Sequence, residues 1–107
     1  MSIIQLEAVN YTDPDGNPAG GYVGGIGLEI VWQKGPLNRG PDRLEPNGAF
    51  VKTVIAAALQ RIEYYQESPF RCRENALAIT KLEEALHWLN HRTAAREERE
   101  VEGTHEA

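Results

Sequence analysis

Apolar and polar residues alternate along the first third of the chain in the pattern of β-strands. The run SIIQLEAV is short and apolar, and DPDGNPAGG after it is dense in residues that form turns. In residues 26–33 (IGLEIVWQ) every second side chain is apolar, which is typical of a half-buried strand. We therefore predict a small antiparallel β-sheet, a hairpin with a flexible Gly-rich connection. Because a lone hairpin is only marginally stable, it needs helices beneath it or a sheet shared with another subunit.

Apolar residues then recur at helical spacing through the second half of the chain. A first helix is expected to begin after Asn47, a good N-cap residue, with an apolar stripe that ends at Tyr65. Pro69 interrupts the pattern, because proline is poorly tolerated inside a helix. A second helix is expected from about Phe70 to about Glu100, a length of roughly 45 Å at 1.5 Å per residue.

The second helix is predicted to carry two apolar faces. The stripe expected to face the first helix consists of Ile79, Leu82, Leu86 and Leu89. The residues on a different side are Leu77, Ala85 and Trp88. A helix that is apolar on two faces has a second partner, and another copy of the chain is the simplest one. The pattern therefore predicts a homo-oligomer.

The predicted fold class is α+β, in a single domain of 107 residues. Residues 1–46 are expected to form the β-hairpin and a loop, and residues 47–107 an antiparallel helical hairpin with a long second helix. The loop at residues 34–48 (KGPLNRGPDRLEPNG) is rich in Pro and Gly and carries Arg39 and Arg43. Loops of this length are uncommon in small domains unless they are functional or packed at an interface. A solvated connector is at least as common as a ligand lid.

Charge and composition exclude several classes of function. The formal net charge of −5 disfavours binding to nucleic-acid polymers through their phosphates. No run approaches eighteen apolar residues, and the first ten residues lack the features of a secretory signal, so we expect no membrane association. The single cysteine, Cys72, cannot form an internal disulfide, which fits a reducing cytoplasm.

The sequence shows no arrangement of residues for catalysis, and it implies no cofactor. Cys72 lies between two arginines, yet no partner base is evident, and a structural cysteine is the more common case. Glu83, His87 and His91 share one helical face, but the HExxH pattern and a third strong metal ligand are missing. A polar face or an interface explains this spacing better than a native metal site does.

Basic and aromatic residues meet at the predicted turn between the helices. Arg71, Arg73 and Asn75 occupy the first turns of the second helix, although the helix dipole disfavours cations there. Tyr64 and Tyr65 end the first helix across the turn. Rings that stack on a base, an amide that reads its edge and guanidinium groups that hold phosphates suit a nucleotide. Surface salt bridges would produce the same residue types about twice as often.

The stretch RIEYYQESPFRCRENALAITKLEEALHWLNHRTAAREEREVEGTH resembles the helical hairpin of phage proteins that sequester immune signals. These are the Thoeris anti-defence sponges and the related anti-CBASS sponges. The block CRENALAITKLEEALHWLNHRT, followed by R..R.VEGTH, is long and specific. The segment EIVWQKGPL resembles the Thoeris type, which has a small sheet before the hairpin. The likeness covers about Leu28 to His105.

The resemblance implies a binding protein rather than an enzyme. Such proteins bind glycocyclic ADP-ribose, the signal that TIR-domain enzymes make, without cleaving it, so that the effector of Thoeris immunity lacks its activator. Some members also bind cyclic di- or trinucleotides at separate sites. They assemble from dimers, commonly into homohexamers, with ligand pockets between subunits. The expected location is the host bacterial cytoplasm.

The same resemblance implies candidate ligand-binding residues. Tyr65 takes the position of an aromatic that stacks on adenine, and Asn75 of CRENA suits a polar edge or a ribose. Arg92 of HRT suits a phosphate, Thr93 follows it in the motif, and Arg71 flanks the site. The candidates for a further cation from the sheet region are Lys34, Arg39 and Arg43.

Asn75 and Arg92 are seventeen residues apart on one predicted helix, roughly 25 Å along its axis. They cannot hold one small nucleotide within one chain, whereas antiparallel pairing of the second helix across subunits would build a composite pocket. Two other readings stay open. One is a structural oligomeric phage protein without a ligand, whose arginines pair with acidic residues of the same helix and its symmetry mates (Glu74, Glu83 and Glu84). The other is a nucleotide-processing enzyme, against which the lack of a nucleophile, a metal motif and paired carboxylates argues.

Overall fold

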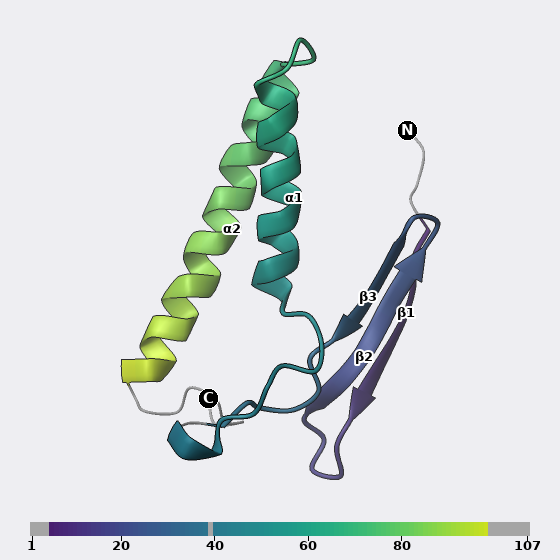
Figure 1. Ribbon diagram of the computed structural model, residues 1–107, viewed down its shortest axis with the longest axis vertical. Helices are drawn as coiled ribbons and strands as arrows, with labels where there is room; N and C mark the ends of the chain where they lie inside the picture. Colours follow the sequence, from purple (N-terminus) through teal and green to yellow (C-terminus); the bar gives the residue numbers. More distant parts are fainter. Residues whose placement is uncertain (1–4, 39, 99–107) are drawn as a thin grey trace. The chain divides into compact units, whose positions relative to one another are not determined.

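A computed structural model describes residues 5–38 and 40–98 and has an α+β architecture, as predicted (Figure 1). The elements in chain order are β1 (Glu7–Thr12), β2 (Pro18–Gly25), β3 (Leu28–Trp32), the short 3-10 helix η1 (Gly40–Asp42), α1 (Val51–Gln66) and α2 (Arg73–Glu98). They fall into two compact units that divide between Phe50 and Val51. No described helix is both long and apolar enough to cross a membrane.

The sheet has three antiparallel strands in the order β1-β2-β3, where the sequence predicted two. The Gly-rich segment expected to be a flexible connection is strand β2 itself. Tyr22 lies at its centre, opposite Val9 on one side and Val31 on the other. Gly21 has a φ of 144°, and a side chain there would clash with the carbonyl oxygen of Val9. Glycine is needed here because the strands approach too closely for a Cβ atom.

The two turns of the sheet follow ordinary turn chemistry. Between β1 and β2, the Asp13 carboxylate accepts the backbone N–H groups of Asp15 and Asn17, each at 2.9 Å. Between β2 and β3, the connection is Ile26 and Gly27, with Gly27 at a φ of 80°. Ile26 was expected to point with the apolar face of the strand, but it lies in this turn and is fully exposed.

The loop after β3 is tied back to the sheet by hydrogen bonds. The Asn47 side chain accepts the Lys34 N–H at 2.7 Å and donates to the Lys34 carbonyl at 3.1 Å. Ala49 bonds to the backbone on both sides of Trp32, as donor to Val31 and acceptor from Gln33. The prediction that Asn47 is the N-cap of the first helix is therefore wrong. The Asn47 side chain is hydrogen-bonded to Lys34 in the loop, and α1 starts at Val51.

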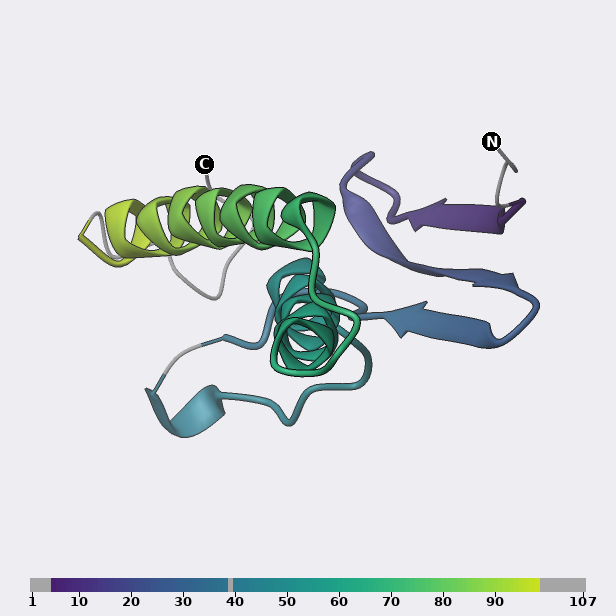
Figure 2. The ribbon, with the colours of Figure 1, turned by 90° about the horizontal axis from the view of Figure 1, so that it is seen from above.

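Helices α1 and α2 pack side by side next to the turn that joins them and diverge away from it (Figures 1 and 2). The half-buried apolar side chains of α1 are Val54, Ile55, Leu59 and Ile62. Those of α2 include the four predicted to face α1: Ile79, Leu82, Leu86 and Leu89. Since α2 has 26 residues and α1 has 16, part of α2 extends past its partner. The start of α2 is Arg73 rather than Phe70, and the predicted end at Glu100 lies outside the described residues.

Apolar surface of the helical hairpin stays open to solvent in the single chain. Leu77 is 46% exposed and Trp88 is 65% exposed, on the second face that the sequence predicted for α2. Ala85, assigned to the same face, is half-buried. Among the described apolar residues, Leu37 in the loop is the one counted as buried. The described part of a single chain thus buries little apolar surface. Homo-oligomerisation stays a prediction.

Candidate functional site

Three side chains, those of Arg61, Tyr64 and Tyr65, contact one another at the end of α1. The rings of Tyr64 and Tyr65 have centroids 6.1 Å apart and are inclined at 52°. The guanidinium carbon of Arg61 lies 5.1 Å from the Tyr64 centroid and 4.8 Å from that of Tyr65. The Arg61 Nε–H also donates to the Tyr65 hydroxyl oxygen at 3.0 Å. Both rings stay accessible, with Tyr64 54% exposed and Tyr65 39% exposed.

The turn that follows is held in one shape by side-chain hydrogen bonds. The Gln66 amide donates to the Cys72 carbonyl at 2.9 Å and accepts the Cys72 N–H at 3.0 Å. The Ser68 hydroxyl donates to the Tyr65 carbonyl and accepts the Phe70 N–H at 3.1 Å. The start of α2 is therefore fixed beside the end of α1, with Arg71 in the turn and Arg73 as the first residue of α2.

The first turn of α2 is capped by sulfur. The Asn75 N–H donates to the Cys72 thiol sulfur at 3.4 Å, so Cys72 is the N-cap residue and serves a structural purpose. Asn75 is half-buried, while Arg71 and Arg73 are exposed. Neither arginine lies within 4.0 Å of a carboxylate oxygen in the described part of the chain. Their charge is thus open to an external anion.

The remaining predicted ligand residues lie near the other end of α2. Thr93 is half-buried and donates its hydroxyl to the Leu89 carbonyl at 3.2 Å. Arg92 is exposed and forms no ion pair with a described carboxylate. At 1.5 Å per residue, the Asn75-to-Arg92 spacing is about 25 Å. The structure therefore brings Tyr65, Arg71 and Asn75 to one end of the hairpin and does not bring Arg92 and Thr93 to them.

The described acidic side chains of α2 form no ion pair with Arg71, Arg73 or Arg92. Among the described residues, the ion pair present joins Lys81 to Glu84 at 3.7 Å, and both side chains are more than half exposed. Glu84 was one of the acids assigned to the arginines in the structural reading. Salt bridges among the described side chains therefore do not account for Arg71, Arg73 or Arg92.

Comparison with known proteins places the hairpin in a family. The model of the Acb2/Tad1 hairpin domain matches residues 25–94, well over half of the chain. The chain belongs to the Acb2/Tad1 hairpin-domain family. It is also 63% identical, over 60 residues, to Thoeris anti-defense 1 of Bacillus phage SBSphiJ7. That match covers 56% of this chain and 42% of the relative, so the chain spans less than half of the relative's length.

The family assignment confirms the resemblance to the Thoeris sponges drawn from the hairpin motifs. All five candidate ligand residues fall inside the matched range, and so do β3, α1, the turn between the helices and α2 up to residue 94. Arg61 and Gln66 also fall inside it, although sequence reasoning assigned no role to either. Arg61 could have been found from its position four residues before Tyr65, because side chains at that spacing meet on a helix.

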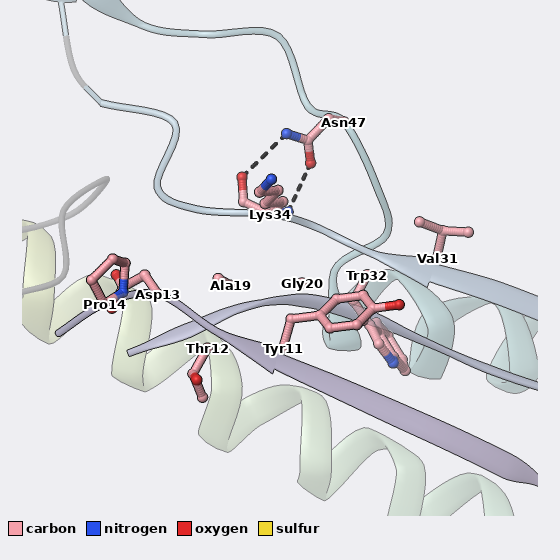
Figure 3. A pocket seen from close by; sticks show the side chains of 11 residues that line it. Tyr11, Thr12, Asp13, Pro14, Ala19, Gly20, Val31, Trp32, Lys34 and Asn47 are labelled. Carbon is pink, nitrogen blue, oxygen red and sulfur yellow. Dashed lines mark hydrogen bonds between the residues drawn. The ribbon is translucent and has the colours of Figure 1, made fainter. Parts of the chain in front are cut away.

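A second candidate site lies on the sheet unit, in a hollow of about 590 Å³ (Figure 3). The residues that line it are Tyr11, Thr12, Asp13, Pro14, Ala19, Gly20, Gly21, Val31, Trp32, Lys34 and Asn47. Most of its wall precedes residue 25 and lies outside the family match. The Asp13 carboxylate and the Asn47 amide are already bonded to turn and loop backbone. Because most of this hollow lies outside the family match, the hairpin end is the stronger candidate.

Of the three cations considered from the sheet region, Lys34 lines this hollow. Arg43 is exposed, and its backbone N–H bonds to Gly40 in the loop. Arg39 lies outside the described residues.

The histidines of α2 pack against the tryptophan between them. The rings of His87 and His91 meet the Trp88 ring nearly edge-on, with centroids 5.3 Å and 6.0 Å away. The part of the chain that the structure describes holds no cluster of three metal-ligating side chains. The three rings instead form one exposed aromatic surface on α2.

Proposed function

We propose that this protein binds glycocyclic ADP-ribose, the signal that TIR-domain enzymes of Thoeris immunity make, and withholds it from its effector without cleaving it. The observation that carries the proposal is the hairpin end inside the family match, which holds exposed tyrosine rings, an amide and guanidinium groups that form no ion pair with a described carboxylate. The name of the Thoeris anti-defense relative supports the same role. The host bacterial cytoplasm is the expected place of action.

Each proposed contact uses ordinary side-chain chemistry. Tyr65 offers an exposed ring on which adenine can stack. Asn75 can donate to and accept from the edge of a base or a ribose. Arg71 and Arg92 can each grip phosphate oxygens with two parallel N–H groups. Thr93 stands beside Arg92 and adds a hydroxyl.

Since the two ends of α2 are about 25 Å apart, one ligand needs both ends from different chains. We propose an antiparallel pairing of α2 with a second copy, which sets Tyr65 of one chain near Arg92 of the other. The exposed Leu77 and Trp88 supply apolar surface for such pairing. A dimer is the proposed building block and a hexamer the proposed assembly.

Sequestration is favoured over hydrolysis because, among the described residues, no general base is hydrogen-bonded to the Cys72 thiol and no metal-binding cluster is present. Within the described part of one chain, Arg71, Arg73 and Arg92 form no ion pair, so the structural reading would need acidic partners from another copy. Cyclic di- and trinucleotides are a further proposed ligand class, carried by the resemblance to the anti-CBASS sponges and not by a described feature.

The proposal is tested by releasing bound nucleotide from the heat-denatured protein. The full chain is incubated with glycocyclic ADP-ribose, freed of unbound ligand by desalting, and denatured by heat; the supernatant is analysed by liquid chromatography and mass spectrometry. Intact signal in an amount near one molecule per proposed pocket supports sequestration. Recovery of a degraded product would show an enzyme, and recovery of no nucleotide would leave the structural reading. A sample carried through the same steps without protein is the control for carry-over.

A further inference from the structure

We infer that Arg61 is a positioning residue of the nucleotide site, which holds the Tyr65 ring ready to stack and leaves one face of that ring for the base. The inference rests on the proposed function, because it concerns the ring assigned to adenine. It adds a residue that neither the sequence motifs nor the family assignment singled out.

The geometry ties Arg61 to Tyr65 in two ways. Its guanidinium carbon lies 4.8 Å from the Tyr65 ring centroid, and its Nε–H bonds to the hydroxyl oxygen of the same ring at 3.0 Å. The Arg61 guanidinium carbon also lies 5.1 Å from the Tyr64 ring centroid, but Arg61 donates no hydrogen bond to Tyr64. One contact fixes the distance and the other fixes the direction of the Tyr65 ring.

Without ligand, the exposed Tyr65 ring needs a restraint if it is to stay in one rotamer. The ring is 39% exposed, and an exposed tyrosine samples several rotamers unless a neighbour restrains it. Ordering a side chain on binding costs affinity, and a ring that is already held avoids part of that cost. Because the guanidinium contacts the ring at its hydroxyl end, a base can still stack on a face of the ring.

The charge of Arg61 is available for this contact. In the described part of the chain it forms no ion pair with a carboxylate. A cation whose charge is not neutralised is attracted more strongly by the negative face of an aromatic ring. The hydroxyl of Tyr65 serves as acceptor to Arg61 and keeps its own O–H for water or ligand.

The experiment is a double-mutant cycle read by titration calorimetry with glycocyclic ADP-ribose. Arg61→Gln should weaken binding roughly 2- to 5-fold, the range of an exposed cation–π contact. In a Tyr65→Leu background the same change should alter binding by less than about 1.5-fold, since the ring it supports is gone. In a Tyr64→Leu background the full effect should persist.

Lys52→Gln is the matched control, because it removes one positive charge from an exposed position near the other end of α1. It should leave binding unchanged, and Arg61→Lys should recover part of the loss. An Arg61→Gln effect that persists in Tyr65→Leu would show direct contact with the ligand and overturn the inference. If Arg61→Gln and Lys52→Gln change the affinity equally, Arg61 acts only through its overall charge, and the inference is overturned as well.

A readout without ligand separates this inference from the proposed function. Three-bond couplings measured by NMR on the free protein should report one χ1 rotamer for Tyr65, and averaging among rotamers in Arg61→Gln. Equal averaging in both proteins would refute the positioning role even if the signal binds. If the couplings behave as expected and the wild-type protein retains no signal, the proposed function is the part that fails.

Discussion

Complementation between two inactive variants would test whether the ligand pocket is shared between chains. Tyr65→Ala removes the stacking ring at one end of the hairpin, and Arg92→Ala removes the guanidinium group near the other end. Each substitution should weaken glycocyclic ADP-ribose binding when the variant is made alone. Both side chains are exposed, so the fold should tolerate either change.

The size of each defect follows from the lost contact. Losing the ring should cost about 1–3 kcal/mol, which is roughly 5- to 160-fold in the dissociation constant. Losing Arg92 should cost about 1.5–3 kcal/mol or more, since a charged hydrogen bond to phosphate disappears. Arg92→Lys should recover part of that loss, because an ammonium group keeps the charge but not the planar fork.

Mixing the variants distinguishes a shared pocket from one within a chain. In a two-fold dimer, each pocket would take Tyr65 from one chain and Arg92 from the other. A mixed dimer of the two variants then has one pocket with both residues intact and one pocket with neither. With random pairing at equal amounts, about half of the dimers are mixed and about a quarter of all pockets are intact.

Co-expression of the two variants followed by titration calorimetry measures that fraction. Native mass spectrometry establishes that mixed assemblies have formed, and each variant alone, at the same total concentration, is the control. The expected result is about 0.25 high-affinity sites per chain relative to wild type, with the wild-type dissociation constant. Mixed assemblies without any high-affinity sites would refute the shared pocket. Wild-type binding by Arg92→Ala alone would refute the role of that arginine.

Three further results are expected. Tyr65→Phe should keep most of the affinity that Tyr65→Ala loses, and equal losses in calorimetry would point to the hydroxyl rather than the ring. Cys72→Ser should raise the free energy of unfolding, measured in urea, by about 0.5–1 kcal/mol, because a hydroxyl oxygen is a better cap acceptor than sulfur. Gln66→Ala should lower the same free energy by about 1–2 kcal/mol, because both hydrogen bonds to Cys72 are lost. If neither substitution changes the free energy of unfolding, the capped turn is contradicted. Trp88→Glu should reduce the mass seen by light scattering, because an unpaired charge in an interface costs several kcal/mol, and an unchanged assembly would place Trp88 outside the interface.

The helical half could be predicted closely because its signals are local. The 3.6-residue spacing of apolar positions predicted both helices and the residues by which α2 faces α1, and the structure has Ile79 and Leu86 half-buried as expected. Pro69 was correctly taken as the break between them. The motifs from Arg61 onward also predicted the family, because a long block of specific residues can be identified without knowing the fold.

The sheet was harder to predict because glycine reads as a turn former and leaves no apolar pattern. The segment PAGGYVGG holds too few side chains to alternate, yet it is the central strand. Gly21 is required by the carbonyl of Val9, a residue from a neighbouring strand. Asn47 was misread for a similar reason, since its partner Lys34 lies thirteen positions away and local propensity favours a helix cap.

The sequence by itself determined the helix pair, its apolar stripes and the kinds of side chain that suit a nucleotide, because these depend on spacing along one chain. Only the tertiary structure decided that Arg71 and Arg92 have no carboxylate partner among the described residues, that Cys72 caps α2, and that Arg61 contacts the Tyr65 ring and hydroxyl. Those facts depend on which rotamers bring side chains within hydrogen-bonding or stacking distance once the helices are packed and the turn is closed. Composition cannot report such distances, because the same residues on an open helix would be free to point elsewhere.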